Sequence, residues 1–193
     1  MNIANKLTMS RIVLSFICMY FIIKNSFVSL IIAFFIFVIA SFTDLFDGLL
    51  ARRLNIVSDF GKILDPIADK VLTIGVFMAF LEIKVIHAWM LVLIISREFL
   101  ITGLRVFFLK RGVVMAAQKF GKHKTFSQMV GSIIIFIILI LNKLVETKGL
   151  KLVFFQRQWD KLLIFLVMLW VVFITIFSGG IYLWRNRKAI RSI

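Results

Sequence analysis

Long apolar runs follow one another along this chain, and they constrain its fold more than any other feature. Hydrophobic residues make up 62% of the 193 positions, with only one Pro and ten Gly, so long helices are favoured over many short strands. Apolar runs of about 18 residues or more are typical of membrane-spanning helices. We place six spans, at residues 8–23, 27–50, 63–81, 88–109, 126–141 and 162–183. The sequence therefore predicts an all-α, polytopic membrane protein with six transmembrane helices in a single domain, residues 1–193.

The net charge of +15 is compatible with two kinds of partner, nucleic acid or an anionic membrane surface. No soluble domain is left over to carry a nucleic-acid site. Most of the Lys and Arg residues lie in the N-terminal segment, the second and fourth connectors and the C-terminal tail. Basic connectors mark the cytoplasmic side of a membrane protein. We therefore expect both termini in the cytoplasm, with no nucleic-acid partner.

The acidic residues are few, and most of the nine are concentrated between Asp44 and Asp69. Asp44 and Asp47 close the second apolar run, and Asp65 and Asp69 open the third. Helical spacing puts each pair on one face, and a short connector makes the two helices antiparallel neighbours, so the acidic faces can meet near the cytoplasmic boundary. Four converging carboxylates repel one another unless cations lie between them, and oxygen ligands favour Mg²⁺ or Mn²⁺. Ion pairing with neighbouring Arg and Lys residues is the alternative.

Two local features near these carboxylates remain open. The small residues Gly48, Ala51 and Gly61 lie on the same helix faces, where they leave room for a nucleotide or serve plain helix packing. Pro66 directly follows Asp65 and disfavours helical geometry there. Either the third span is kinked at this point, or its regular part begins near Asp65.

The carboxylates and small residues together form one motif that resembles the signature of the CDP-alcohol phosphatidyltransferases. All eight defining positions match, in the order Asp44-x₂-Asp47-Gly48-x₂-Ala51-Arg52-x₈-Gly61-x₃-Asp65-x₃-Asp69. The resemblance implies a six-helix membrane enzyme, generally homodimeric, that joins an alcohol to a CDP-activated partner and releases CMP. It implies two Mg²⁺ or Mn²⁺ ions held by Asp44, Asp47, Asp65 and Asp69, with Asp69 also the general base. The implied CDP pocket comprises Thr8, Asp47, Gly48, Ala51, Arg52 and Gly61.

Three further segments are similar to the phosphatidylglycerophosphate synthases of that family. They are residues 5–11, 96–105 and 121–129, and the one departure is Ala4, where many members have Pro. This likeness implies CDP-diacylglycerol as donor, glycerol 3-phosphate as acceptor, and a bacterial cytoplasmic (inner) membrane with the active site near the cytoplasmic face. Beyond Val130 the likeness is one of hydropathy only.

A dianionic acceptor phosphate needs basic residues, and four are candidates: Arg97, Arg105, Lys122 and Lys124. The alternatives are membrane anchoring for the two lysines, and snorkelling or pairing with Glu98 for the two arginines. Phosphatidylglycerol, serine or inositol phosphate as acceptor stays open, because charge does not separate inositol phosphate from glycerol 3-phosphate. A membrane protein that binds cations without catalysis is a further alternative.

Overall fold

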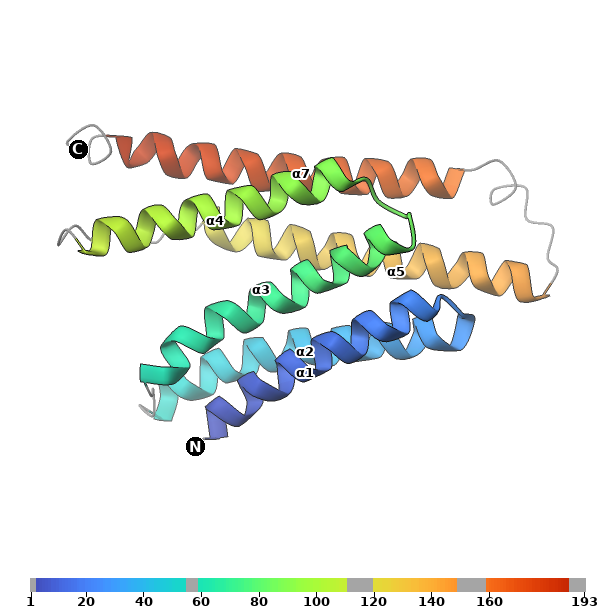
Figure 1. Cartoon of the computed structure of the whole chain (residues 1–193), viewed down its shortest axis with the longest axis horizontal. Helices are drawn as coiled ribbons and strands as arrows, with labels where there is room; N and C mark the ends of the chain where they lie inside the picture. Colours follow the sequence, from blue (N-terminus) through green and yellow to red (C-terminus); the bar gives the residue numbers. More distant parts are fainter. Residues whose placement is uncertain (1–2, 55–58, 111–119, 149–158, 188–193) are drawn as a thin grey trace.

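The computed structural model describes residues 3–54, 59–110, 120–148 and 159–187, with side chains for 8–43, 68, 70–108, 124–148 and 159–187. The part it describes is entirely helical. The helices are α1 (Ile3–Lys24), α2 (Phe27–Leu54), α3 (Asp59–Glu82), α4 (Ala88–Lys110), α5 (Phe120–Lys148) and α7 (Trp159–Arg185), as Figure 1 shows. Each contains one predicted span, so the six helices predicted from hydropathy are confirmed.

Two short turns reverse the chain between α1 and α2 and between α3 and α4. Asn25 and Lys84 adopt left-handed backbone angles, with φ of 48° and 59°, and Asn is among the residues that tolerate this region best. Ser26 and Ser29 cap the start of α2 reciprocally: the Ser29 amide donates to Ser26 Oγ at 3.2 Å, and the Ser26 amide donates to Ser29 Oγ at 2.8 Å. These turns make the paired helices antiparallel.

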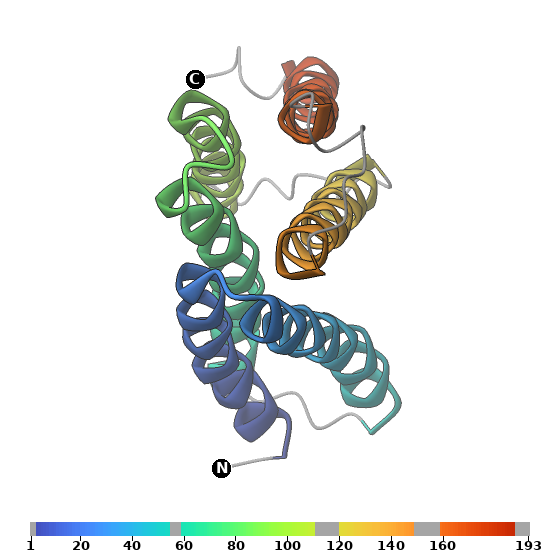
Figure 2. The same cartoon turned by 90° about the vertical axis from the view of Figure 1, so that its right-hand side faces the viewer.

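Helix α1 organises the first half of the bundle, because it packs extensively along both α2 and α3. Direct contact between α2 and α3 is slight, although they run antiparallel as predicted. In the second half α5 packs along α7, and α4 also packs on α7; Figure 2 shows the two groups end on. Helix α7 is therefore a neighbour of both α4 and α5, the two helices that carry the predicted phosphate-binding residues.

An aromatic cluster joins the two halves near the middle of the bundle. The Phe136 ring of α5 lies 5.7 Å from that of Phe37 in α2 and 5.1 Å from that of Phe80 in α3, measured between centroids. All three side chains are fully buried. Edge-on and tilted aromatic pairs at such distances stabilise a core beyond the area they bury. The position of α5 relative to α2 and α3 therefore depends on this cluster.

Within the part of the chain that the structure describes, two helices are long and apolar enough to cross a membrane by length and composition. They are Lys124–Lys148, with mean hydropathy 2.2, and Trp159–Arg185, with mean hydropathy 2.7. Large apolar side chains are exposed on other helices as well; Phe16, Phe35 and Phe99 are each more than half exposed. Exposed apolar surface of this extent is typical of a face covered by lipid or protein.

The backbone at Pro66 rules out one of the two possibilities left open by the sequence. Helix α3 runs without interruption from Asp59 to Glu82, so it is helical on both sides of this proline. The regular part of the helix therefore does not begin near Asp65. That alternative was wrong, because the preceding turns form without the hydrogen bond that the proline lacks.

Candidate active site

The four predicted metal ligands lie where α2 ends and α3 begins. Asp44 and Asp47 belong to the last turns of α2, and Asp65 and Asp69 to the first turns of α3, at one end of the bundle in Figure 1. Both segments are helical, which is the condition on which the predicted spacing depends. Four carboxylates form a donor set that suits hard divalent ions. Their side chains, and those of Gly48, Ala51, Arg52 and Gly61, lie outside the described residues, so these assignments stay predictions.

Two polar residues of α1 are buried at this same end. Thr8, predicted to line the CDP pocket, is 1% exposed, and so is Arg11, a residue to which the sequence assigned no role. Since α1 packs along both α2 and α3, these side chains lie in the half of the molecule that carries the aspartates. A guanidinium buried in an apolar helix is costly, which makes Arg11 a functional candidate.

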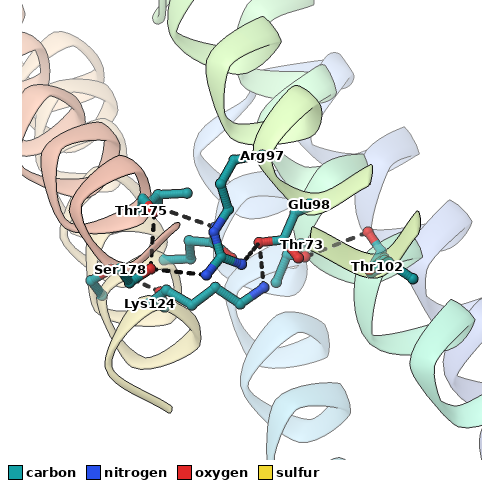
Figure 3. A network of polar contacts seen from close by, with 10 residues as sticks. Thr73, Arg97, Glu98, Thr102, Lys124, Thr175 and Ser178 are labelled. Atoms are coloured by element: carbon teal, nitrogen blue, oxygen red, sulfur yellow. Dashed lines mark hydrogen bonds and ion pairs between the residues drawn. The ribbon is translucent and has the colours of Figure 1, made fainter. Parts of the chain in front are cut away.

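Glu98 joins two of the four predicted phosphate-binding residues. Its carboxylate Oε1 accepts from Arg97 Nη1 at 3.2 Å and from Lys124 Nζ, so a residue of α4 is linked to the first part of α5. Figure 3 shows the three side chains converging. Glu98 is 5% exposed, so the carboxylate lies between two cations and away from solvent. The cluster of these three residues, called here the cationic cluster, carries a net charge of +1.

Arg97 is also held by α7. Its Nη2 donates to Ser178 Oγ at 3.0 Å, and the Ser178 hydroxyl in turn donates to the Thr175 carbonyl at 2.9 Å. The Arg97 Nε is buried and has no acceptor among the described residues. A buried N–H without an acceptor costs free energy, so an incoming oxygen atom is favoured at this position.

The other two predicted phosphate-binding residues are placed differently. Arg105 lies about two turns further along α4, exposed, with its guanidinium 6.0 Å from the centroid of the Tyr182 ring. It therefore faces α7, as Arg97 does, but lies outside the hydrogen-bonded group. Lys122 belongs to the first turn of α5, and its side chain is not among the described ones. The structure thus brings Arg97 and Lys124 together and leaves Lys122 untested.

A contact between α3 and α4 links the cationic cluster to the aspartate-bearing helix. Lys70 Nζ donates to Thr102 Oγ1 at 2.7 Å. Lys70 directly follows Asp69 on α3, and Thr102 lies one turn beyond Glu98 on α4. A band of polar residues therefore crosses from α3 through α4 and α5 to α7. It places the predicted acceptor site next to the turn of α3 that carries the predicted base.

Sequence reasoning missed the contribution of α7 to this band. Thr175 and Ser178 are buried in the most apolar helix of the chain, and Gln128 Nε2 donates to Thr175 Oγ1 at 3.4 Å. Their spacing of three residues on one helix face was a usable signal, because buried hydroxyls in an apolar helix serve a partner. No pattern in the sequence, however, indicates that the partner is on α4.

The opposite end of the bundle contains a cavity of about 500 Å³. Its polar lining includes Asn25, Lys84, Asn142, Lys143 and Asp160, above an apolar floor. Asn142 Nδ2 donates to Asp160 Oδ2 at 2.9 Å, and Lys143 pairs with Glu146 at 2.8 Å. Charged residues thus occur at both ends, but only the site end carries the predicted aspartates.

Comparison with known proteins defines the class. The family model of the CDP-alcohol phosphatidyltransferases matches residues 1–186, and the chain belongs to this family. A relative from Bacillus subtilis, named CDP-diacylglycerol–glycerol-3-phosphate 3-phosphatidyltransferase, is 36% identical over 204 residues, covering 99% of this chain and 98% of its own. A relative of the same name from Rickettsia typhi is 37% identical, covering 94% of each chain. A probable phosphatidylglycerophosphate synthase from Mycobacterium tuberculosis is 37% identical over 67% of this chain and 63% of its own.

Proposed function

We propose that this chain transfers a phosphatidyl group from CDP-diacylglycerol to glycerol 3-phosphate, giving phosphatidylglycerophosphate and CMP. The observation that carries the proposal is the largely shielded pair of cations on Arg97 and Lys124, linked through α4 to the helix that carries Asp69. Family membership and the names of the relatives agree with this donor and acceptor.

The acceptor phosphate binds to the basic residues at the junction of α4, α5 and α7. Arg97 offers its Nε, which has no acceptor among the described residues; Lys124 adds a point charge, and Arg105 and Lys122 complete the set. A guanidinium and an ammonium together suit a dianionic phosphate, because the first binds its oxygens directionally and the second adds charge without a fixed direction. A neutral alcohol has no need for such a cluster.

The donor binds through its CDP group at the facing ends of α1, α2 and α3. Thr8, Asp47, Gly48, Ala51, Arg52 and Gly61 form that pocket, and Thr8 lies on α1, which packs along both α2 and α3. Asp44, Asp47, Asp65 and Asp69 would hold two Mg²⁺ or Mn²⁺ ions, which would neutralise charge on the phosphate oxygens.

Asp69 takes the proton from the free primary hydroxyl of glycerol 3-phosphate. The resulting oxygen attacks the phosphorus that bears the diacylglycerol group, and the bond between this phosphorus and the oxygen of CMP breaks. CMP leaves with the bonding electrons, and the proton remains on Asp69 until it passes to water. Positioning of the two phosphates by the basic residues and by the carboxylate end supplies much of the rate enhancement.

The same proposal includes the topology and assembly. Six helices cross a bacterial cytoplasmic membrane, both termini lie in the cytoplasm, and the site opens at the cytoplasmic face. The two span candidates among the described residues and the exposed phenylalanines support a membrane location. The enzyme works as a homodimer, on the strength of the family resemblance.

Label transfer tests the proposal. Purified protein in mild detergent is incubated with CDP-diacylglycerol, Mg²⁺ and labelled glycerol 3-phosphate, with and without EDTA. We expect label in the lipid phase, equimolar CMP, and loss of both with EDTA and their return with excess Mg²⁺. CMP release only with another alcohol, such as inositol phosphate, would refute the acceptor but not the reaction class. Metal-dependent cation flux in liposomes without CMP release would refute the enzyme.

A further inference from the structure

Gly179 lies directly beneath the side chain of Arg97. A Cβ placed on Gly179 would lie 3.1 Å from Arg97 Cγ and 3.3 Å from Arg97 Nε. Such distances are shorter than ordinary van der Waals contact, so the arginine side chain lies flat against the backbone of α7. Any residue larger than Gly at this position must displace it.

Ser178, the neighbouring residue, fixes the other end of the same side chain. Its hydroxyl accepts from Arg97 Nη2 at 3.0 Å and is itself oriented by donation to the Thr175 carbonyl. Ser178 is 5% exposed and Thr175 is fully buried, so the hydroxyl has little competition from water. One turn of α7 therefore contacts Arg97 along its aliphatic part and at its tip.

Glu98 supplies the third restraint from α4 itself. With Nη1 bound to Glu98 and Nη2 bound to Ser178, the Nε edge is the part of the guanidinium without an acceptor among the described residues. The side chain is 11% exposed, so it has little freedom to rotate. The guanidinium plane is thus set before any ligand binds, which lowers the entropy cost of ligand binding.

We infer that the Thr175–Gly179 turn of α7 is the positioning element of the acceptor site, with Ser178 and Gly179 holding Arg97 in the orientation that receives the acceptor's phosphate. This inference rests on the proposed function and deepens it. Ser178 and Gly179 are positioning residues, because they act on the phosphate through Arg97 and not by contact with the reacting atoms. Helix α7 thereby acquires a role in substrate recognition as well as in spanning the membrane.

Two adjacent glycines provide a matched pair for the test. A Cβ on Gly180 would meet no heavy atom within 4 Å, in contrast to one on Gly179. Both residues belong to the same turn of the same helix, so the intrinsic helix-stabilising effect of Ala is shared. Gly131→Ala serves as a packing control, because its Cβ would lie 2.5 Å from Val171 Cγ2, away from the cationic cluster.

The experiment measures KM for glycerol 3-phosphate and for CDP-diacylglycerol, together with kcat and the melting temperature in detergent. For Ser178→Ala we expect the acceptor KM to rise about tenfold, because one hydrogen bond to a charged group is lost. For Gly179→Ala we expect a rise of roughly three- to tenfold, because a flexible side chain yields to the added methyl group. The donor KM stays at the wild-type value in all three variants, and Gly180→Ala also keeps the wild-type acceptor KM and kcat. The melting temperature of Gly179→Ala matches that of Gly180→Ala, because both variants gain the helix-stabilising effect of Ala. Ser178→Ala melts slightly lower than the wild type, because Arg97 Nη2 loses a buried acceptor.

Three outcomes overturn the inference. The first is a wild-type acceptor KM in both Ser178→Ala and Gly179→Ala. The second is an equal rise of both KM values with a fall in melting temperature, the behaviour expected of Gly131→Ala and of a merely structural role. The third is a matching effect in Gly180→Ala. Failure of the proposed function itself is distinguishable, because the wild-type protein would then release no CMP with glycerol 3-phosphate.

Discussion

Each end of the bundle carries a pair formed by a lysine and a glutamate, and the two pairs differ in environment. At the site end, the Lys124 and Glu98 side chains are 15% and 6% exposed. At the opposite end, Lys143 and Glu146 are 29% and 69% exposed, and they are neighbours on one helix turn. The exposed pair is solvated and worth little. The buried pair joins two helices and shares its carboxylate with Arg97, so it is a preorganised group of charges.

The comparison shows that position, more than charge, separates a functional residue from a membrane anchor. Both ends of the molecule are basic, and hydropathy alone treats their lysines alike. Among the described residues, only the cations at the site end are largely buried, joined by a common carboxylate and linked to the helix of the predicted base. At the opposite cavity, Lys143 pairs with Glu146 on its own helix, and the described residues show no carboxylate there that two cations share.

The largest expected effect is on kcat, when a carboxylate at the site end is removed and compared with removal of one at the opposite end. Asp69→Asn should lower kcat by about 10²- to 10⁴-fold, because the general base is lost. Asp160→Asn, at the opposite end, should change kcat less than twofold. Both are measured as CMP release from protein whose melting temperature is also recorded. Near-wild-type turnover in folded Asp69→Asn would remove Asp69 from the mechanism.

A smaller effect, on the KM for the acceptor, is expected when a lysine at the site end is removed and compared with removal of one at the opposite end. Lys124→Ala should raise the KM for glycerol 3-phosphate about 10- to 100-fold, because a charge-assisted interaction with the phosphate is lost. Lys143→Ala should leave that KM unchanged. Steady-state kinetics with varied acceptor measures both. Equal effects of the two substitutions would mean that the site end has no special affinity for the acceptor phosphate.

Substituting the glutamate of each pair tests the comparison through the free energy of unfolding. Glu98→Gln should lower the free energy of unfolding by roughly 3 kcal/mol, because two buried cations lose their counter-charge. Thermal unfolding with and without glycerol 3-phosphate measures this effect. The ligand should raise the melting temperature of Glu98→Gln more than that of the wild type, because its phosphate replaces the missing negative charge. A melting temperature that is insensitive to the ligand would argue against phosphate binding at this position.

The smallest effect concerns the exposed pair. Glu146→Gln should change the free energy of unfolding by less than about 0.5 kcal/mol, because an exposed pair on one helix turn contributes little. The same thermal unfolding assay in detergent measures it. A loss comparable with that of Glu98→Gln would show that exposure does not distinguish the two pairs.

The helices were predictable because hydropathy reports the part of each helix that has apolar side chains. Helix α5 shows the limit of this approach: the predicted span covers 126–141, whereas the helix runs from Phe120 to Lys148. Its two ends are polar, and helical hydrogen bonds continue there without an apolar pattern to signal them. Element type was therefore easier to predict than element length.

The candidate site was predictable where a residue belongs to a local motif, and unpredictable where a contact depends on tertiary packing. Arg97 and Lys124 were identified from their segments, and the structure brings them together through Glu98. Ser178 and Gly179 were not identified, because nothing in an apolar helix indicates which face meets α4. The roles of the four aspartates remain predictions from their spacing and from the family resemblance.

The aromatic contact of Phe136 is a point about which a small tilt of α5 would move the end of the helix that carries Lys124. Lys124 lies twelve residues from Phe136, a distance of about 18 Å along the helix. A rigid tilt of α5 by about 5° around this contact would move the lysine by roughly 1.5 Å, enough to matter for a reaction that depends on orientation. The distance between the phosphate-binding end and the carboxylate end therefore depends on how three phenylalanine rings fit together in the apolar interior.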